Sequence, residues 1–293
     1  MKASGTYVFW AAYFLAAALC QVLAGDFPET LFGFPANAAV MLLWAVGLMV
    51  LFKEKRSSRL VSMLLSKQST FVLIGAFAAT CLIQGFSAER LSGTWWFIAA
   101  AFAFLSHLFL VLLRGMQMKR PHKLRFFLNH AGLLAALAGG FFGSPDAMEW
   151  KALAQPGTPV REAVADDGSL VPAEYRLQLD SLEINSYDNG VPKDFRAFLT
   201  DETGRDIALR VNHPFRLSWQ DDLYLSGVHV SEVGGERVCI LQIVRQPWKY
   251  MEFAGILMLL CGCMLLFLQG TGQRKAQDMA LRTDDKGGRD LCA

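Results

Sequence analysis

The sequence predicts a membrane protein with about six transmembrane helices and a small antiparallel β domain inserted outside the membrane. Hydrophobic types make up 53% of the 293 residues and charged types only 18%. The apolar residues gather in blocks long enough to cross a bilayer core, which takes about 20 helical residues. Between about residues 145 and 248 the sequence is mixed and polar instead. One chain therefore contains segments suited to two environments.

The apolar blocks predict spans at about 6–24, 36–52, 70–86, 94–113, 126–143 and 250–269. The predicted organisation is a membrane domain over 1–143, an external β-rich domain over 144–249, a sixth helix over 250–270 and a disordered cytoplasmic tail over 271–293. The first block also resembles a cleaved signal peptide, since Leu23-Ala24-Gly25 is similar to a cleavage site. A retained span is favoured, because Lys2 is a weak basic start and the apolar stretch is long.

Basic residues in the loops predict the orientation. Two loops, 53–67 and 114–125, each hold five Lys or Arg residues, and Arg274 and Lys275 follow the last span. The facing loops hold Asp26 and Glu29, then Glu89 with Arg90. The positive-inside rule therefore places both basic loops and both termini in the cytoplasm and residues 144–249 outside. With the basic residues explained in this way, the net charge of +2 does not indicate a nucleic-acid partner.

The external segment reads as β structure. Alternating or β-branched runs cover 175–184, 195–200, 207–211, 223–230 and 238–244, and turn signals separate them at Asp188-Asn189-Gly190, Glu202-Thr203-Gly204 and Gly234-Gly235. Five or six such strands predict a small antiparallel sandwich or open barrel. The spacing suggests no set of nucleophile and base, so no catalytic residue is assigned.

Two histidines fall inside predicted spans, where a polar side chain is a functional hypothesis by default. His107 is about 10 Å along its helix from Arg114, and His130 is about 7.5 Å from Arg125. The two spans leave one cytoplasmic loop, so both rings belong to the inner half of the bilayer and could face one cavity. A neutral imidazole is a good axial ligand for haem iron. Alternatively, His107 bonds a carbonyl in the bundle and His130 reaches headgroups or water.

Small residues follow His130, including Gly132, Gly139 and Gly140. They would admit either a flat macrocycle or a neighbouring helix. His213 and His229 in the external domain are more typical of ordinary surface residues. Aromatic residues at the outer interface (Trp95, Trp96, Trp248 and Tyr250) read as membrane anchors.

The six cysteines form no disulfide pattern, and Cys239 is the only one in the external segment. Cys261-Gly262-Cys263 is not a redox CxxC motif, and these cysteines are expected to serve as small buried side chains. The chain has no CxxCH motif with which to attach haem covalently to itself.

Several ordered motifs resemble the ResB/CcsB-type cytochrome c biogenesis proteins. The run 126–132, Phe-Phe-Leu-Asn-His-Ala-Gly, resembles that family's NHxG span, and 187–195 resembles its YxxGxPxxF segment. Val211-Asn212-His213-Pro214 is similar to its VNHP strand end, and Gln246-Pro247 to its re-entry into the membrane. The resemblance covers about 126–268, while the first four spans match only in hydropathy and number.

The resemblance implies a subunit of the system II cytochrome c synthetase in the bacterial cytoplasmic membrane. Such a subunit helps convey haem b across the membrane and present it to the CxxCH thiols of apocytochrome c. A CcsA-type partner supplies the WWD haem-binding segment, which this chain lacks, so the chain is expected to be an inactive part of a haem lyase when alone. His130 occupies the position of an axial haem ligand, whereas His107 has no such support.

Two other functions compete with this one. A b-type electron carrier would use His107 and His130 to hold two haems. A haem-free scaffold would dock a periplasmic partner through its β domain.

Overall fold

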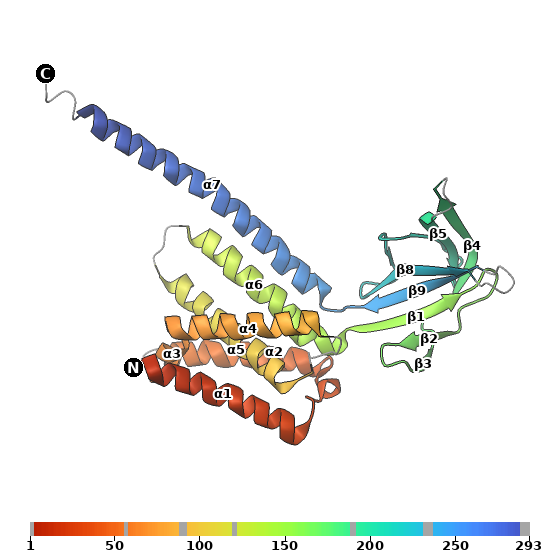
Figure 1. Ribbon diagram of the computed structural model, residues 1–293, viewed down its shortest axis with the longest axis horizontal. Helices are drawn as coiled ribbons and strands as arrows, with labels where there is room; N and C mark the ends of the chain where they lie inside the picture. The colour runs from red at the N-terminus through yellow and green to blue at the C-terminus, as the bar shows by residue number, and fades with distance from the viewer. Residues whose placement is uncertain are drawn as a thin grey trace. The chain divides into compact units, whose positions relative to one another are not determined.

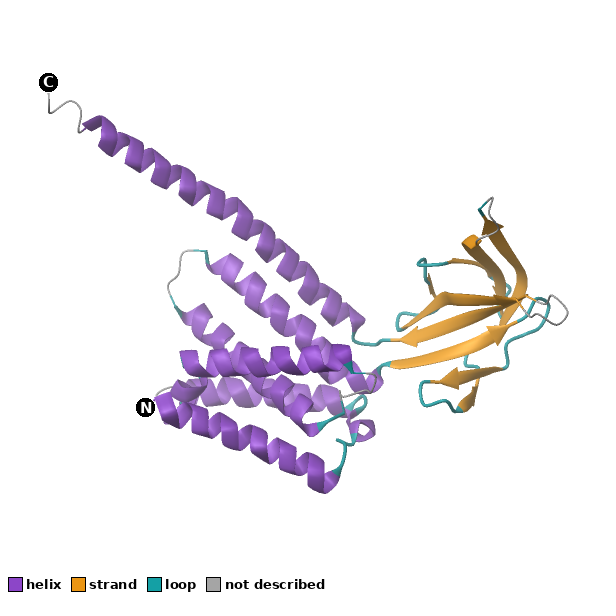
Figure 2. Ribbon diagram, viewed as in Figure 1, coloured by secondary structure: helices purple, strands orange, loops and turns teal. Residues whose placement is uncertain are grey.

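A computed structural model describes residues 3–55, 58–87, 93–118, 122–187, 192–230 and 237–287 (Figure 1). Two compact units make up the chain. One is helical and comprises Met1–Pro145 with Tyr250–Ala293, and the other comprises Asp146–Lys249. Figure 2 shows the second unit as strands.

In the described part of the chain, six helices are long and apolar enough to cross a membrane. They are α1 (Ala3–Ala24), α2 (Ala36–Glu54), α4 (Lys67–Phe86), α5 (Trp95–Gln117), α6 (Lys123–Gly143) and α7 (Lys249–Gly287). Short helices lie between them: η1 (Glu29–Phe32), α3 (Arg59–Leu64) and η2 (Ser144–Asp146). The six predicted spans are confirmed.

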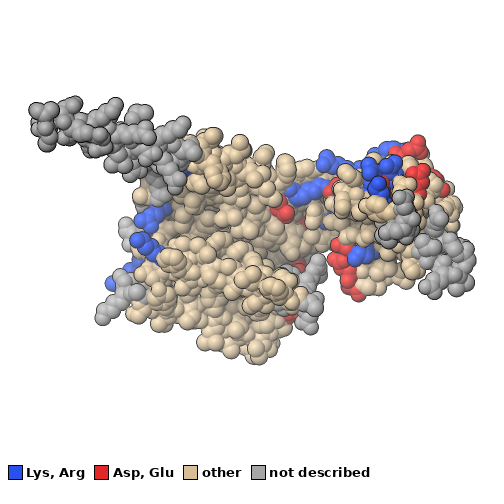
Figure 3. Space-filling view, turned by 45° about the horizontal axis from the view of Figure 1, so that its top comes forward, with Lys and Arg blue, Asp and Glu red and all other residues tan. Residues whose placement is uncertain are grey.

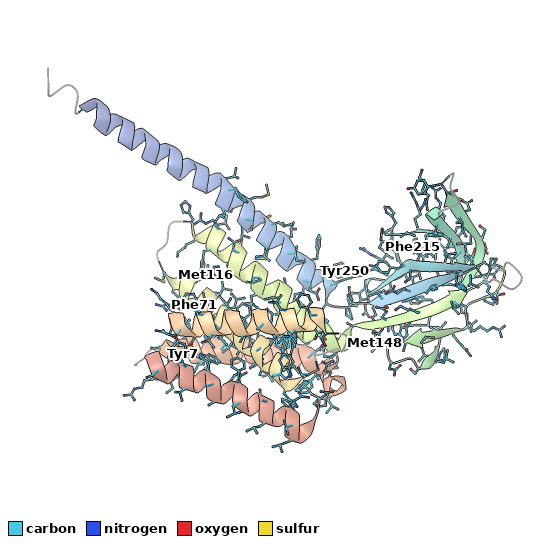
Figure 4. The ribbon with its side chains drawn as sticks, viewed as in Figure 1. Tyr7, Phe71, Met116, Met148, Phe215 and Tyr250 are labelled. Atoms are coloured by element: carbon cyan, nitrogen blue, oxygen red, sulfur yellow. The ribbon has the colours of Figure 1, made fainter. Side chains whose placement is uncertain are left out.

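The spanning helices expose large apolar side chains, as expected of helices that lie in lipid. Tyr7 on α1 and Phe71 on α4, both labelled in Figure 4, are exposed. In the view of Figure 3 the helical unit is almost free of charge, with blue side chains gathered at one end. The basic residues in described loops are Lys53, Lys55, Arg59, Lys67, Arg114, Lys123 and Arg125. Of the other loop charges used for the orientation, Arg56, Glu89, Arg90, Lys119 and Arg120 lie outside the described residues.

Helix α5 is the centre of the helical unit, because it packs against α1, α2, α4 and α6. Its small residues Ala100, Ala101 and Ala103 are buried and allow this close packing. Helices α6 and α7 meet at glycine residues. A Cβ atom on Gly132 would lie 2.7 Å from the carbonyl oxygen of Gly255. The glycines after His130 are thus used to admit a neighbouring helix.

The second unit contains two antiparallel sheets in its described residues. The larger has the order β3-β2-β1-β9-β8-β7 and the smaller β4-β5-β6. The strands are β1 (Met148–Ala154), β2 (Glu162–Ala165), β3 (Leu170–Pro172), β4 (Leu177–Ser186), β5 (Pro192–Asp201), β6 (Asp206–Arg210), β7 (Phe215–Arg216), β8 (Asp221–Val230) and β9 (Arg237–Arg245). One buried core, which includes Leu199 and Leu241, joins residues of both sheets. The unit is therefore a sandwich.

The five predicted strand regions correspond to β4, β5, β6, β8 and β9, but β1, β2, β3 and β7 were missed. Strand β1 reads Met-Glu-Trp-Lys-Ala-Leu-Ala, with alanines as its buried residues Ala152 and Ala154. Alanine is a poor strand former, so this strand depends on its pairing with β9. Strands β3 and β7 have only three and two residues, too few to show a period.

Of the predicted turns, the one at Glu202-Thr203-Gly204 is present, and Gly204 adopts φ +80° there. The turns Asp188-Asn189-Gly190 and Gly234-Gly235 lie outside the described residues. The segment after residue 270, for which the sequence predicts disorder, begins within the last part of α7. Helix α7 continues to Gly287, through the good helix formers of 273–281. Residues 288–293, with Cys292, are not described.

Candidate functional site

His130 lies two turns into α6, close to the end of the helix that carries Lys123 and Arg125. Its Nδ1 atom is 2.9 Å from the carbonyl oxygen of Phe126. A carbonyl can only accept a hydrogen bond, so Nδ1 must donate and therefore carries the proton. Nε2 then keeps its lone pair in the neutral ring. In the part of the chain that the structure describes, no hydrogen bond engages Nε2.

The ring of Phe126 fixes the His130 imidazole from one side. The two rings stack with centroids 4.0 Å apart and an angle of 28° between their planes. Phe126 in turn packs against Gly115 of α5, where any side chain would overlap the phenyl ring. The imidazole is half-buried. Its orientation is thus set by its own helical turn and by an aromatic ring that α5 supports.

His107 is placed differently. It is buried in α5, with Nδ1 2.7 Å from the carbonyl oxygen of Leu64 and Nε2 3.1 Å from the Oγ1 atom of Thr70. Leu64 is the last residue of α3, so its carbonyl has no partner within that helix. His107 therefore ties α3 to the bundle, and both of its nitrogens are engaged.

Other side chains complete this attachment of α3. Ser69 donates to the carbonyl of Met63 at 2.6 Å and accepts from the indole of Trp10 at 2.9 Å. Arg114 reaches the carbonyl of Leu65 at 3.4 Å. The terminal carbonyls of α3 are thus satisfied by α4 and α5, with α1 joined through Trp10.

A haem group would require only one or two axial ligands from the protein, and His130 offers one with a lone pair in place. The Nδ1–H to carbonyl bond is the kind of contact that orients a ligating histidine and raises its basicity. The donor at His130 thus fits an iron ligand, whereas His107 would have to give up a hydrogen bond. The described residues contain no cluster of three or more His, Cys, Asp or Glu side chains for a bare metal ion.

In the β unit, the predicted motif residues shape turns. Asn212 adopts φ +62°, which asparagine tolerates well, and the amide of His213 bonds the carbonyl of Arg210 at 3.0 Å. The side chains of His213 and His229 are at least partly exposed. Cys239 is fully buried in β9, and burial raises the pKa of its thiol to about 11, so it is unreactive at neutral pH.

A polar cluster that sequence reasoning missed surrounds Asp221 in the β unit. Arg245 donates two hydrogen bonds to this carboxylate, one from Nε to Oδ1 at 2.7 Å and one from a terminal nitrogen to Oδ2 at 3.2 Å. Tyr175 and Ser218 donate to the same Oδ2 at 2.5 and 2.7 Å. Burial raises the pKa of Asp221, but these donors outweigh it and hold the pKa below its usual range.

The ends of the β unit are also joined by polar contacts. The indole of Trp248 donates to Asp146 at 2.7 Å, and Lys249 pairs with Asp222 at 2.6 Å. Trp248 was predicted as a membrane anchor, and its ring nitrogen closes the base of this unit. The partners lie 102 and 27 residues apart, so no local pattern reveals them.

Residues 120–240 match the model of the ResB-like family. The predicted resemblance is therefore confirmed for this segment, which is less than half of the chain and includes His130 and the motifs at 187–195 and 211–214. Among solved structures, the chain is similar to "Cytochrome c Heme Lyase CcmF" at 13% identity and a TM-score of 0.37. That alignment covers 90% of this chain and 45% of the other, so the chain spans less than half of that protein's length. None of the curated proteins matches the chain.

Proposed function

We propose that this chain is a membrane subunit of a system II cytochrome c synthetase. It conveys haem b across the bacterial cytoplasmic membrane and helps present it to the CxxCH thiols of apocytochrome c. The observation that carries the proposal is the position of His130 within the ResB-like segment, with Nδ1–H bonded to a carbonyl and Nε2 left with its lone pair. In this proposal, a CcsA-type partner with a WWD segment completes the activity.

His130 acts as the axial ligand that holds the haem in transit. A neutral imidazole binds iron without bringing a charge into the bilayer. The stacked ring of Phe126 shields one face of the imidazole and limits its rotation. A single ligand such as His130 also suits release of the haem, since one Fe–N bond to the protein is easier to break than a complete set of protein ligands.

The proposed orientation puts the two ends of the pathway on opposite sides. The basic loops and both termini lie in the cytoplasm by the positive-inside rule, and the β unit lies in the periplasm. His130, near Lys123 and Arg125 on α6, is then close to the cytoplasmic face, where haem is made available. The β unit is then in the periplasm, on the same side of the membrane as the apocytochrome.

The alternative of a di-haem carrier is disfavoured by the environment of His107. Both of its nitrogens hold α3 and α4, so iron ligation would break the contact with Leu64 or with Thr70.

Co-purification of haem tests the proposal. We expect His130→Ala, co-expressed with a CcsA-type partner, to lose at least about tenfold of the bound haem, since second-shell changes alone cost 10- to 100-fold in metal affinity. Cytochrome c maturation should fall in parallel, and added imidazole should restore haem binding in His130→Gly. His107→Gln is the matched control and should keep its haem. Normal haem content in His130→Ala would contradict the assignment, and equal losses in both variants would favour the di-haem carrier.

A further inference from the structure

The helical unit contains a partly open cavity of about 510 Å³ that neither intramembrane histidine lines. Residues of α2, α4, α5 and α6 form its walls together with η1. On α6 it is lined from Ala136 to Phe142, in the half of the helix away from Lys123 and Arg125. His130 lies six residues before Ala136, about 9 Å along the helix. The cavity is thus a separate feature of the bundle.

The lining is almost entirely hydrocarbon. Phenylalanines from α4, α5, α6 and the 27–32 segment form much of it, and its polar residues are Glu29, Asn37 and Ser144. The Asn37 side chain is already satisfied, since it donates to the carbonyl of Phe142 and accepts from the amide of Ala38, both at 2.8 Å. Among the described residues that line it, there is no His, Cys, Met or Tyr to ligate iron and no Lys or Arg to neutralise a carboxylate. It therefore suits an uncharged apolar occupant and not haem.

The volume of the cavity further limits which occupants fit it. One helical turn with its side chains occupies on the order of 500 Å³, so a spanning helix of a partner would need several times this volume. Water does not fill a cavity lined by hydrocarbon, and an empty one forfeits the contacts of all its lining atoms. The surrounding helices are apolar enough to lie in a bilayer, where hydrocarbon chains are the abundant small occupants.

We propose that this cavity is a binding site for a single membrane hydrocarbon chain, either the acyl chain of a lipid or an isoprenoid tail. The aromatic side chains of the walls hold the hydrocarbon chain through dispersion contacts. Glu29, Asn37 and Ser144 lie at the end where the polar head of the lipid would leave the cavity. The proposal does not depend on the role of His130.

Two glycines provide a matched pair of variants. Gly140 lines the cavity, and the nearest atom to a Cβ placed there is Glu252 Oε1 at 3.9 Å, so a Cβ is accommodated without a clash. At Gly75 in α4, a Cβ would have nothing within 4 Å, and this residue does not line the cavity. Gly140→Phe should fill the cavity, while Gly75→Phe changes the same residue type at a helix surface.

Native mass spectrometry of the full chain released from lipid nanodiscs is the test. We expect one retained lipid on the unchanged chain and on Gly75→Phe, and at least a fivefold loss of that species in Gly140→Phe. Solvent extraction of the purified protein then separates the two sources, since acyl lipids and isoprenoid quinones differ in mass. Equal retention in both variants, or co-extraction of haem lost only in Gly140→Phe, would overturn the proposal.

A fluorescence measurement covers the case in which Gly140→Phe does not fold. Trp44 contacts two lining residues, with ring centroids 5.5 Å from Phe142 and 6.2 Å from Phe102. In the otherwise unchanged chain, lipids with brominated chains should quench a component of emission that Trp44→Phe removes. Emission that such lipids quench equally with and without Trp44 would also contradict the proposal.

Discussion

Asp221 shows how a single carboxylate stabilises the β unit. Its side chain is only 3% exposed, and it accepts hydrogen bonds from Arg245, Tyr175 and Ser218. Arg245 also lies over the ring of Trp150, at 5.1 Å from the centroid, and pairs with Glu174 at 2.6 Å. The carboxylate therefore connects β8 and β9 with the segment before β4.

Replacing Asp221 should reveal this contribution. We expect Asp221→Asn to lower the free energy of unfolding by about 3 kcal/mol, because it leaves Arg245 with a buried partner of no charge. Thermal unfolding of the full chain in detergent measures the loss. Asp206→Asn, an exposed residue of β6, is the control and should change little. Similar unfolding curves for the two variants would argue against the role given to Asp221.

The acid sensitivity of the β unit follows from the same carboxylate and from Asp201. The pKa of Asp201 is lowered to about 2, chiefly by the hydroxyl of Thr203, and that of Asp221 is lowered as well. Groups with depressed pKa values stabilise the fold above their unfolded value of about 3.9 and lose this contribution as pH falls through the folded value. Stability should therefore be flat from about pH 5 to 7 and fall from about pH 4 toward pH 2. A midpoint of unfolding that stays constant to about pH 2 would contradict this.

At the residue scale, the sequence alone singles out His130 as a candidate ligand and gives no sign of the Asp221 cluster. His130 stands out because an intramembrane histidine within a recognisable motif needs no partner to be noticed. The Asp221 cluster is invisible, since Arg245 and Tyr175 are 24 and 46 residues away and meet Asp221 only when the strands pair. His107 was noticed for the same reason as His130. Only its contacts show that it ties α3 in place.

At the scale of elements, the pair α6 and α7 depends on glycine. The close approach of Gly132 and Gly255 leaves no room for side chains on either helix at that point. Spanning helices gain little from hydrophobic burial in lipid, so such close contacts are what hold them together. Hydropathy predicted both helices correctly but could not tell which faces would meet.

Substitution of Gly255 tests this contact with Gly132 and Ala136. Gly255→Leu should cost about 1–3 kcal/mol through overpacking and loosen α7 from α6. Gly47→Leu, at a position with nothing within 4 Å, is the matched control and should be close to neutral. Thermal unfolding in detergent compares the two. If both variants unfold at the same temperature as the unchanged chain, the helices do not depend on this contact.

At the scale of the whole molecule, charge distribution is the feature that sets orientation. The described basic loop residues belong to the segments between α2 and α4 and between α5 and α6, while the β unit is inserted between α6 and α7. In the proposed topology, one spanning helix, α6, separates the second basic loop from the β unit and places the two on opposite sides of the membrane. This prediction of orientation uses only hydropathy and charge, which do not depend on tertiary contacts.

Labelling of single cysteines checks the orientation. A membrane-impermeant maleimide should label Asp206→Cys in intact cells with a permeable outer membrane, since residue 206 is exposed on the β unit. Lys55→Cys, in the first basic loop, should react only after the inner membrane is opened. The unchanged chain gives the background from native thiols. The reverse pattern of labelling would invert the proposed topology.

The pairing of β1 with β9 runs over seven residue pairs, from Met148 opposite Arg245 to Ala154 opposite Cys239. The strand through which the chain enters the β unit and the strand through which it leaves are thus immediate neighbours, and Trp248 and Asp146 fasten their ends. A module whose two ends emerge side by side can be exchanged, enlarged or trimmed with little disturbance to the helices on either side of it. The β unit is in this sense an inserted domain whose two connections to the helices lie side by side. The outer surface of the β unit can therefore change in sequence while the contacts among the helices are kept.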